Sequence, residues 1–164
     1  MADFDKEFFE GVKDGVTKGK IEYINIAGIS PEVAELRHVK FRLPASKMHM
    51  NHVGMVYAGS YFVFVEATGA SLIKCTYGST YVPIIKNMSL DYKKPCTGDL
   101  VVDISMTEEE AEERIAYVKE HGKGQYPMEI PIADAEGNVC AVANITYYPV
   151  SYTHLRAHET KANL

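Results

Sequence analysis

One carboxylate stands alone inside a long apolar stretch of this chain. The segment from Asn51 to Ile73 reads NHVGMVYAGSYFVFVEATGASLI. Between Val53 and Ile73, Glu66 is the only acidic or basic residue. Burial without a partner would raise the pKa of this carboxyl, because desolvation disfavours the charged form. A carboxyl tuned in this way can act as a general base or as a nucleophile. Glu66 is therefore the first candidate for a catalytic residue.

The stretch around Glu66 must belong to an element that carries this carboxylate into the protein interior. Apolar and small residues follow one another there without a polar face, which is typical of a helix buried on every side. We expect the helix to lie within residues 51–73. A membrane span needs about 20 consecutive apolar residues, and Glu66 interrupts the only candidate. The sequence therefore predicts a core helix and no membrane partner.

Composition sets further limits on the protein class. A chain of 164 residues with 46% hydrophobic and 24% charged residues is typical of one globular domain with a substantial core. Its net charge of −5 argues against nucleic acid as the main partner. Cys75, Cys96 and Cys140 have no C-x-x-C spacing and are expected to be free thiols. With no signal-peptide pattern at the N-terminus, we expect a cytoplasmic protein.

The segments on either side of the apolar stretch are expected to cover it. Residues 3–18 place apolar side chains at near-helical spacing, which predicts an amphipathic helix, and residues 21–29 are read as an edge strand or a loop. Residues 33–43 alternate between apolar and polar, as in a half-buried strand. Residues 80–93 and 100–106 are two further extended stretches.

The C-terminal half predicts a helix and then a hairpin. Thr107 and Glu110 match a capping box at the start of an acidic helix. Residues 128–133 and 139–148 flank a turn-rich connector, as the strands of a hairpin do. Four to six strands and one apolar helix need to cover each other. The fold class is therefore α+β, with a curved antiparallel sheet wrapped around one long buried central helix.

The chain divides into three expected parts. Residues 1–30 hold the N-terminal helix and an edge segment, residues 31–150 the main domain, and residues 151–164 a tail that continues no strand. His154 and His158 in the tail are four residues apart but lack a third metal ligand, so no metal or other cofactor is expected. The string SYTHLRAHET is similar to a translated sequencing adapter. We expect removal of the tail to leave the melting temperature unchanged.

The apolar helix carries a motif with a family resemblance. The pattern N-H-x-G-x-x-Y-A-G-x-x-F-x-x-x-E, from Asn51 to Glu66, resembles that of hotdog-fold acyl-CoA thioesterases of the phenylacetate-pathway type. In that family an Asn, a Gly and a His-Gly-Gly step precede a catalytic Asp or Glu. The stretch Asp91-Tyr-Lys-Lys-Pro95 is similar to the Tyr-x-x-Pro that follows in the same family. The resemblance covers roughly residues 33–150 and implies a hotdog fold.

The resemblance also implies roles for individual residues. Glu66 would be the general base or the nucleophile that acts on the thioester carbonyl. The backbone N–H of Ala58, helped by Gly59, would hold the developing oxyanion at the start of the helix. Asn51 would position the attacking water or the thioester. Tyr57 stands where many relatives have His, Ala58 replaces the first glycine, and catalysis would then lack help from a histidine side chain.

Helix geometry makes the expected site a shared one. Eight residues separate Ala58 from Glu66, which is about 12 Å along a helix that rises 1.5 Å per residue. The two groups cannot both contact one carbonyl, so the oxyanion donor and the carboxylate must come from two subunits. We therefore expect a homodimer, or a dimer of dimers, that hydrolyses an acyl-CoA.

Several alternatives stay open. Lys93 and Lys94 could bind the phosphates of coenzyme A or lie on an ordinary solvated surface. Tyr61 and Phe62 could line an acyl pocket or fill the core. A non-catalytic acyl-CoA-binding module would use Glu66 only for hydrogen bonding within the core. His52 lies fourteen residues before Glu66, a separation that also occurs in hotdog dehydratases, and it could equally be structural.

Overall fold

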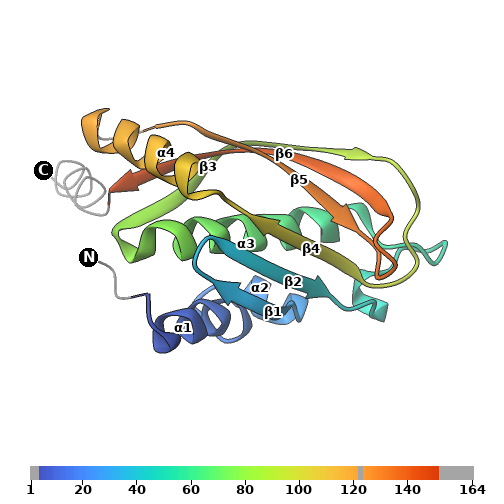
Figure 1. Ribbon diagram of the computed structural model, residues 1–164. Helices are drawn as coiled ribbons and strands as arrows, with labels where there is room; N and C mark the ends of the chain where they lie inside the picture. Colours follow the sequence, from blue (N-terminus) through green and yellow to red (C-terminus); the bar gives the residue numbers. More distant parts are fainter. Residues whose placement is uncertain (1–3, 122–123, 152–164) are drawn as a thin grey trace, which may run out of the picture.

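One long helix lies across an antiparallel six-stranded sheet that curves around it (Figure 1). The computed structural model describes residues 4–121 and 124–151. The helices are α1 (Lys6–Thr17), α2 (Glu22–Ala27), α3 (Ala58–Tyr77) and α4 (Glu108–His121). The strands are β1 (Ser30–Glu35), β2 (His38–Leu43), β3 (Tyr81–Tyr92), β4 (Leu100–Ser105), β5 (Tyr126–Ala133) and β6 (Val139–Ser151). This is the expected architecture of a sheet wrapped around a central helix.

The order of the strands leaves β3 at one end of the sheet. The order is β1-β2-β4-β5-β6-β3, and each neighbouring pair is antiparallel. β3 pairs with β6 from Tyr81 opposite Ser151 to Tyr92 opposite Ala141. Within the described residues β3 has no partner on its other edge. A twelve-residue strand therefore presents a free row of backbone donors and acceptors.

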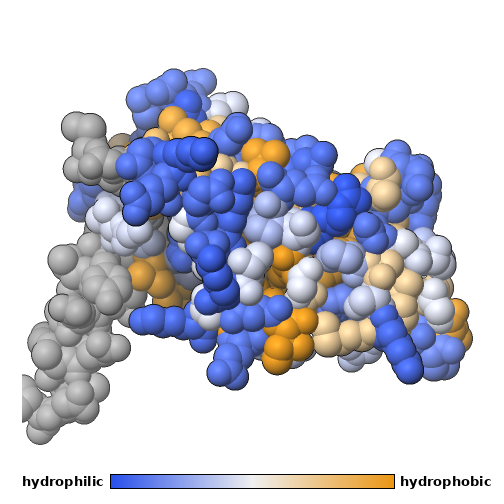
Figure 2. Space-filling view, turned by 90° about the horizontal axis from the view of Figure 1, so that it is seen from below, coloured by the Kyte–Doolittle hydropathy of each residue, from blue (hydrophilic) through white to orange (hydrophobic). Residues whose placement is uncertain are grey.

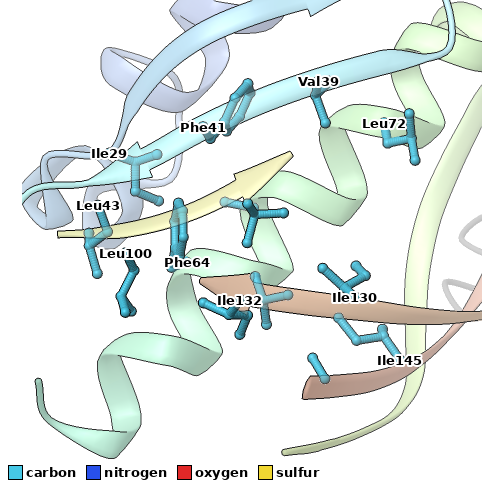
Figure 3. Close-up of a cluster of buried hydrophobic side chains, with 14 of the residues drawn as sticks. Ile29, Val39, Phe41, Leu43, Phe64, Leu72, Leu100, Ile130, Ile132 and Ile145 are labelled. Carbon is cyan, nitrogen blue, oxygen red and sulfur yellow. The ribbon is translucent and has the colours of Figure 1, made fainter. Parts of the chain in front are cut away.

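The core lies between the sheet and α3. Figure 3 shows apolar side chains of β2, β4, β5 and β6 pointing toward Phe64 and Leu72 of α3. In β2, Val39, Phe41 and Leu43 are buried, whereas the residues between them are only half-buried, as the alternation predicts. Each such apolar side chain contributes about 1.5–3 kcal/mol when it is removed from water. This packing attaches α3 to the concave face of the sheet.

The central helix begins at Ala58, where the family resemblance places its start, and it ends at Tyr77, four residues beyond the expected stretch. Residues 51–57 form a tight loop because the Asn51 side chain holds it. The Asn51 Oδ1 accepts the backbone N–H groups of Val53 (3.0 Å) and Met55 (3.1 Å), and the Asn51 N–H donates to the Met55 oxygen. Gly54 adopts a φ of 78° inside this loop, a conformation that favours glycine. The apolar pattern alone could not reveal this boundary.

Most of α3 is buried, but one side of it is not fully covered. The buried residues include Phe64, Val65, Leu72 and Ile73. Half-buried residues recur on the remaining side at helical spacing, and we call them the open stripe: Gly59, Phe62, Val63, Glu66, Ala70 and Tyr77. Glu66 lies in the middle of the open stripe. The helix is therefore packed by its own chain everywhere except along the line that carries its carboxylate.

The first 43 residues of the chain differ from the sequence prediction in two places. Residues 22–27 form helix α2 instead of an edge strand or loop, and Gly28 ends the helix with a φ of 66°. Residues 33–43, predicted as one strand, contain the end of β1 and all of β2, which form a hairpin. Arg37 makes that turn with a φ of 59°, a conformation that sequence reasoning expects of glycine or asparagine.

The predicted capping box of α4 is confirmed. The Glu110 N–H donates to the Thr107 Oγ1 at 3.2 Å, and the Thr107 N–H donates to the Glu110 carboxylate at 2.9 Å. The predicted C-terminal hairpin is confirmed as β5 and β6. The tail histidines His154 and His158 lie outside the described residues, as do all of residues 152–164. The expectation that the tail is dispensable stays a prediction.

Candidate functional site

Glu66 is half-buried on the open stripe of α3. In the described part of the chain its carboxylate has no hydrogen bond and no ion pair, although its backbone oxygen accepts a bond from Tyr147. Burial raises the pKa of the Glu66 carboxyl above its usual range, and the positive charge of Lys74 opposes this shift. The carboxyl is therefore destabilised in its charged form and free to meet another molecule.

The first turn of α3 offers unpaired backbone donors. Among the described residues, the N–H groups of Ala58 and Gly59 have no acceptor, whereas the Ser60 N–H bonds the Tyr57 oxygen at 2.9 Å. No side chain caps the helix. Tyr57, the residue before the helix, is extended with φ −64° and ψ 135°, and its N–H donates to the His49 oxygen. This helix end can bind a negative charge through its free N–H groups and its dipole.

A pocket of about 330 Å³ opens beside this helix end, and we call it the lysine pocket. Six of its lining residues are polar, aromatic or part of the helix start: Asn51, Ala58, Tyr61, Tyr92, Lys93 and Lys94. Five of these six are candidate site residues of the sequence analysis, and the sixth, Tyr92, is the tyrosine of the Tyr-x-x-Pro resemblance. The volume lies at the lower end of the range of about 300–1,000 Å³ that is typical of ligand pockets.

Backbone bonds bring these distant segments together. The N–H groups of Lys93 and Lys94 both donate to the Cys140 oxygen, at 2.8 and 3.1 Å, which attaches the segment after β3 to the start of β6. The Val56 N–H donates to the Cys96 oxygen at 2.8 Å. The Tyr92 hydroxyl reaches the Ala58 oxygen at 3.0 Å and so ties the end of β3 to the first residue of α3.

Asn51 and Tyr61 are held in defined orientations at the pocket wall. Because the Asn51 Oδ1 accepts two backbone N–H groups, the amide orientation is fixed and its Nδ2 remains a donor. The buried ring of Tyr61 packs edge-to-face against Tyr92, with 5.3 Å between the ring centroids. Burial raises the pKa of the Tyr61 hydroxyl, so this residue stays neutral. The pocket thus has a polar donor on one wall and an aromatic surface on another.

The structure does not bring every predicted residue to this pocket. Glu66 does not line it, because eight residues of helix, about 12 Å, separate it from Ala58. His52 is exposed, has no hydrogen bond among the described residues and lies outside the pocket. Phe62 lies on the open stripe. Tyr57 turns its ring away from the lysine pocket and packs it over Gly59, where a side chain would collide with the ring.

The sequence places His49 in a polar loop before the helix and gives it no functional role. Its imidazole is buried between the end of α2 and the first turn of α3. The Nε2 lies 2.7 Å from the Ala27 backbone oxygen and the Nδ1 lies 3.2 Å from the Ser60 Oγ. No periodic pattern or motif includes His49, and both of its partners become neighbours only through the tertiary fold.

Two further findings bear on the class of protein. Among the described residues, no helix is both long and apolar enough to cross a membrane. In the same part of the chain, no group of three or more His, Cys, Asp or Glu side chains is placed to hold a metal ion. Cys75, Cys96 and Cys140 are free and buried.

Comparison with solved structures identifies the fold. A Pseudomonas aeruginosa protein of unknown function, PA5026, described as a probable thioesterase, superimposes with a TM-score of 0.80. The two sequences are 29% identical over 87% of this chain and 95% of that one. The thioesterase HI1161 of Haemophilus influenzae superimposes with a TM-score of 0.67 at 12% identity, over 92% of this chain and 96% of that one. The architecture is therefore the hotdog fold.

The sequence itself matches one family model. Residues 20–148 match the family described as a domain of unknown function, DUF4442. Comparison with curated proteins finds no significant match. The chain belongs to the DUF4442 family, and it has the hotdog fold in common with PA5026 and HI1161.

Proposed function

We propose that this protein hydrolyses an acyl-CoA thioester at a site shared between two subunits of a homodimer. Glu66 of one subunit acts on the thioester carbonyl, and the helix start of the other subunit holds the oxygen of that carbonyl. The names of the structural relatives, which include thioesterases, support the reaction class. No metal or redox cofactor enters the proposed reaction.

One observation carries the proposal more than any other. Thioester hydrolysis needs a carboxylate and donors for the developing oxyanion. In the described part of the chain, a carboxylate with a raised pKa and two helix N-terminal N–H groups are present without hydrogen-bond partners. Unpaired polar groups of this kind cost stability unless a ligand or another subunit completes them. Their arrangement is therefore better explained by function than by folding.

The chemistry follows from these two groups. The Glu66 carboxylate either takes a proton from water as the water attacks the carbonyl carbon, or attacks that carbon directly to form an anhydride that water then hydrolyses. In both routes negative charge develops on the carbonyl oxygen, and the Ala58 and Gly59 N–H groups of the other subunit stabilise it. The thiolate of coenzyme A leaves and takes up a proton.

The proposed dimer follows from the sheet edge and the open stripe. The free edge of β3 is twelve residues long, whereas β1 at the other end is six residues long and packs against α1. A long uncovered edge is a template on which another strand can pair. Two copies joined through β3 would place their α3 helices near each other, because α3 packs against β3 in each copy. That arrangement would cover the open stripe and bring Glu66 to the partner's helix start.

The lysine pocket supports coenzyme A as the carrier. The exposed Lys93 and Lys94 line this pocket together with Ala58, the first residue of α3. Lysine ammonium groups bind phosphate oxygens as point charges, and coenzyme A carries phosphates at the far end from its thiol. The Asn51 Nδ2 is a further donor to the amide groups of the pantetheine arm.

A thiol-release assay tests the proposed hydrolysis. The wild-type protein should release free coenzyme A from members of an acyl-CoA panel, and Glu66→Gln should lower the rate by about 10² or more. Glu129→Gln, which removes an exposed carboxylate on β5, is the matched control and should keep full activity. If acyl-CoA binds but neither wild type nor control releases thiol, the protein is an acyl-CoA-binding module instead.

A further inference from the structure

A second pocket lies beside the first turn of α3, away from the lysine pocket. It has a volume of about 180 Å³, and we call it the apolar pocket. Its walls come from α2, the segment before α3 and α3 itself, and include Ile26, Met48, Tyr57, Gly59 and Val63. None of the residues that line the apolar pocket is acidic or a lysine or arginine.

The apolar pocket has a fixed frame. His49 bridges α2 and α3, because its Nε2 donates to the Ala27 oxygen at the end of α2 and its Nδ1 faces the Ser60 hydroxyl in the first turn of α3. A carbonyl oxygen can only accept, so the hydrogen of the neutral ring is on Nε2 and the Ser60 hydroxyl donates to Nδ1. The polar atoms of the frame thus bond to each other, which leaves mainly carbon surface for a ligand.

The rim of the pocket is unusually apolar for a surface. Tyr23, Ile26, Met48 and Tyr57 all line it and are exposed by 70%, 63%, 55% and 57%. Figure 2 shows hydrophobic residues among the polar ones in the middle of the face that α1 and α2 cover. Large apolar side chains that gather around a hollow are typical of a ligand-binding site.

The two pockets meet at the oxyanion donors. Tyr57 and Gly59 line the apolar pocket, whereas Ala58 between them lines the lysine pocket. If the carbonyl oxygen of a thioester accepts bonds from the free N–H groups at this point, the two groups on either side of the carbonyl extend into different pockets. Val63 and Gly59 also belong to the open stripe, so the apolar pocket lies on the side of α3 that carries Glu66.

We infer that the apolar pocket holds the acyl group of the substrate, while the coenzyme A part occupies the lysine pocket. This inference rests on the proposed thioester hydrolysis and names the class of substrate. The pocket is smaller than the range of about 300–1,000 Å³ that whole ligands occupy. It therefore suits an uncharged acyl group of limited size, such as a single ring or a short aliphatic chain.

Binding of hydrolysis-resistant thioethers tests the inference without relying on turnover. Coenzyme A and its S-ethyl, S-butyl, S-hexyl, S-decyl and S-benzyl thioethers are titrated into the full-length protein by calorimetry. In the wild type, affinity should rise by up to about fourfold per methylene and then level off once the pocket is full. Val63→Phe, which fills the pocket, should remove this rise and leave the affinity for coenzyme A unchanged.

A matched pair of variants controls for general effects on the surface. Ile26→Asn changes a pocket residue of α2, and Ile21→Asn makes the same change outside the pocket, at the similarly exposed residue that precedes α2. The first should flatten the dependence on chain length, and the second should preserve it. A wild-type affinity that does not rise with chain length, or a rise that survives both Ile26→Asn and Val63→Phe, would overturn the inference.

The same proteins separate this inference from the proposed hydrolysis. Thiol release from butyryl-CoA is measured in parallel with thioether binding. If the thioethers show the expected rise but no thiol is released, the acyl pocket stands and the hydrolase proposal fails. If thiol is released while affinity is independent of chain length, the hydrolase proposal stands and the acyl group binds elsewhere.

Discussion

The Tyr147 hydroxyl donates a hydrogen bond to the backbone oxygen of Glu66, at 3.0 Å. Tyr147 lies on β6 with its side chain fully buried, and Glu66 lies in the middle of α3. Gly69 lets the ring approach, because a side chain there would overlap the Tyr147 hydroxyl. The sheet thus fixes the helical turn that carries Glu66 through its backbone, and the carboxylate is left free on the open stripe.

Gly69→Ala should destabilise the protein, although alanine normally favours a helix. The added methyl group would push Tyr147 off the helix, and overpacking of this kind costs about 1–3 kcal/mol. The melting temperature should fall by several degrees. A melting temperature equal to or above that of wild type would show that Tyr147 does not dock on this glycine.

Tyr147→Phe tests the same contact from the other side. Loss of the hydrogen bond to the Glu66 oxygen should cost about 0.5–1.5 kcal/mol. In the double variant the alanine meets no hydroxyl, so Gly69→Ala should cost less than it does alone. Chemical denaturation of all four proteins measures this coupling, and additive effects would contradict direct contact.

Glu66→Gln should make the folded protein more stable at neutral pH. Burial raises the pKa of Glu66 in the folded state above its value in the unfolded state. Between these two pKa values the folded state binds more protons than the unfolded state, so the stability of the wild type falls as the pH rises. Glutamine does not titrate. The gain in free energy of unfolding of Glu66→Gln over wild type should therefore be small below the ordinary carboxyl pKa of about 4.3. It should reach a plateau above the raised pKa of the folded state.

Denaturation curves recorded at several pH values measure this difference. A Glu66→Gln protein that is less stable than wild type at neutral pH would mean that a partner group stabilises the charged carboxylate. That result would also remove the reason for regarding Glu66 as the free acid of a catalytic site.

Ala58→Pro should abolish activity and spare the fold. Proline is well tolerated at the first position of a helix, and the extended Tyr57 before it already has a conformation that proline accepts. The substitution removes the Ala58 N–H alone, and loss of one oxyanion donor typically lowers kcat by about 10²–10³. Ala58→Gly keeps the N–H and should remain active. Equal activity in the two variants, at unchanged melting temperatures, would exclude this N–H as an oxyanion donor.

Replacement of Lys93 and Lys94 by Gln should weaken coenzyme A binding without slowing the chemistry. Exposed charges contribute about 0.2–1 kcal/mol each, so the loss of two should raise KM for an acyl-CoA by about two- to thirtyfold while kcat stays the same. The matching acyl-pantetheine, which lacks the phosphates, should show no change in KM. A similar rise in KM for both substrates would show that the substitutions change the shape of the pocket and that the lysines do not recognise the phosphates.

The sequence predicts the fold well where one pattern dominates. The alternation of β2, the capping box at Thr107 and Glu110, and the apolar run of α3 each have a single physical explanation, and the structure contains all three. Five candidate residues of the sequence line one pocket, namely Asn51, Ala58, Tyr61, Lys93 and Lys94, and their catalytic and binding roles stay predictions.

Other features depend on contacts that no local pattern contains. The start of α3 is set by the hydrogen bonds of the Asn51 side chain, and the turn between β1 and β2 uses Arg37 instead of a glycine. The apolar pocket arises because His49 joins two helices that are far apart in the sequence. Such features become visible only when the tertiary neighbours of each residue are known.

A subunit-mixing experiment tests the shared site most directly. Ala58→Pro and Glu66→Gln homodimers should each be nearly inactive, because each lacks one half of every site. After the two are unfolded together and refolded, half of the dimers are mixed, and one of the two sites in each mixed dimer is intact. Thiol release should then recover to about a quarter of the wild-type rate. A mixture that stays as inactive as its parents would contradict a site built from two subunits.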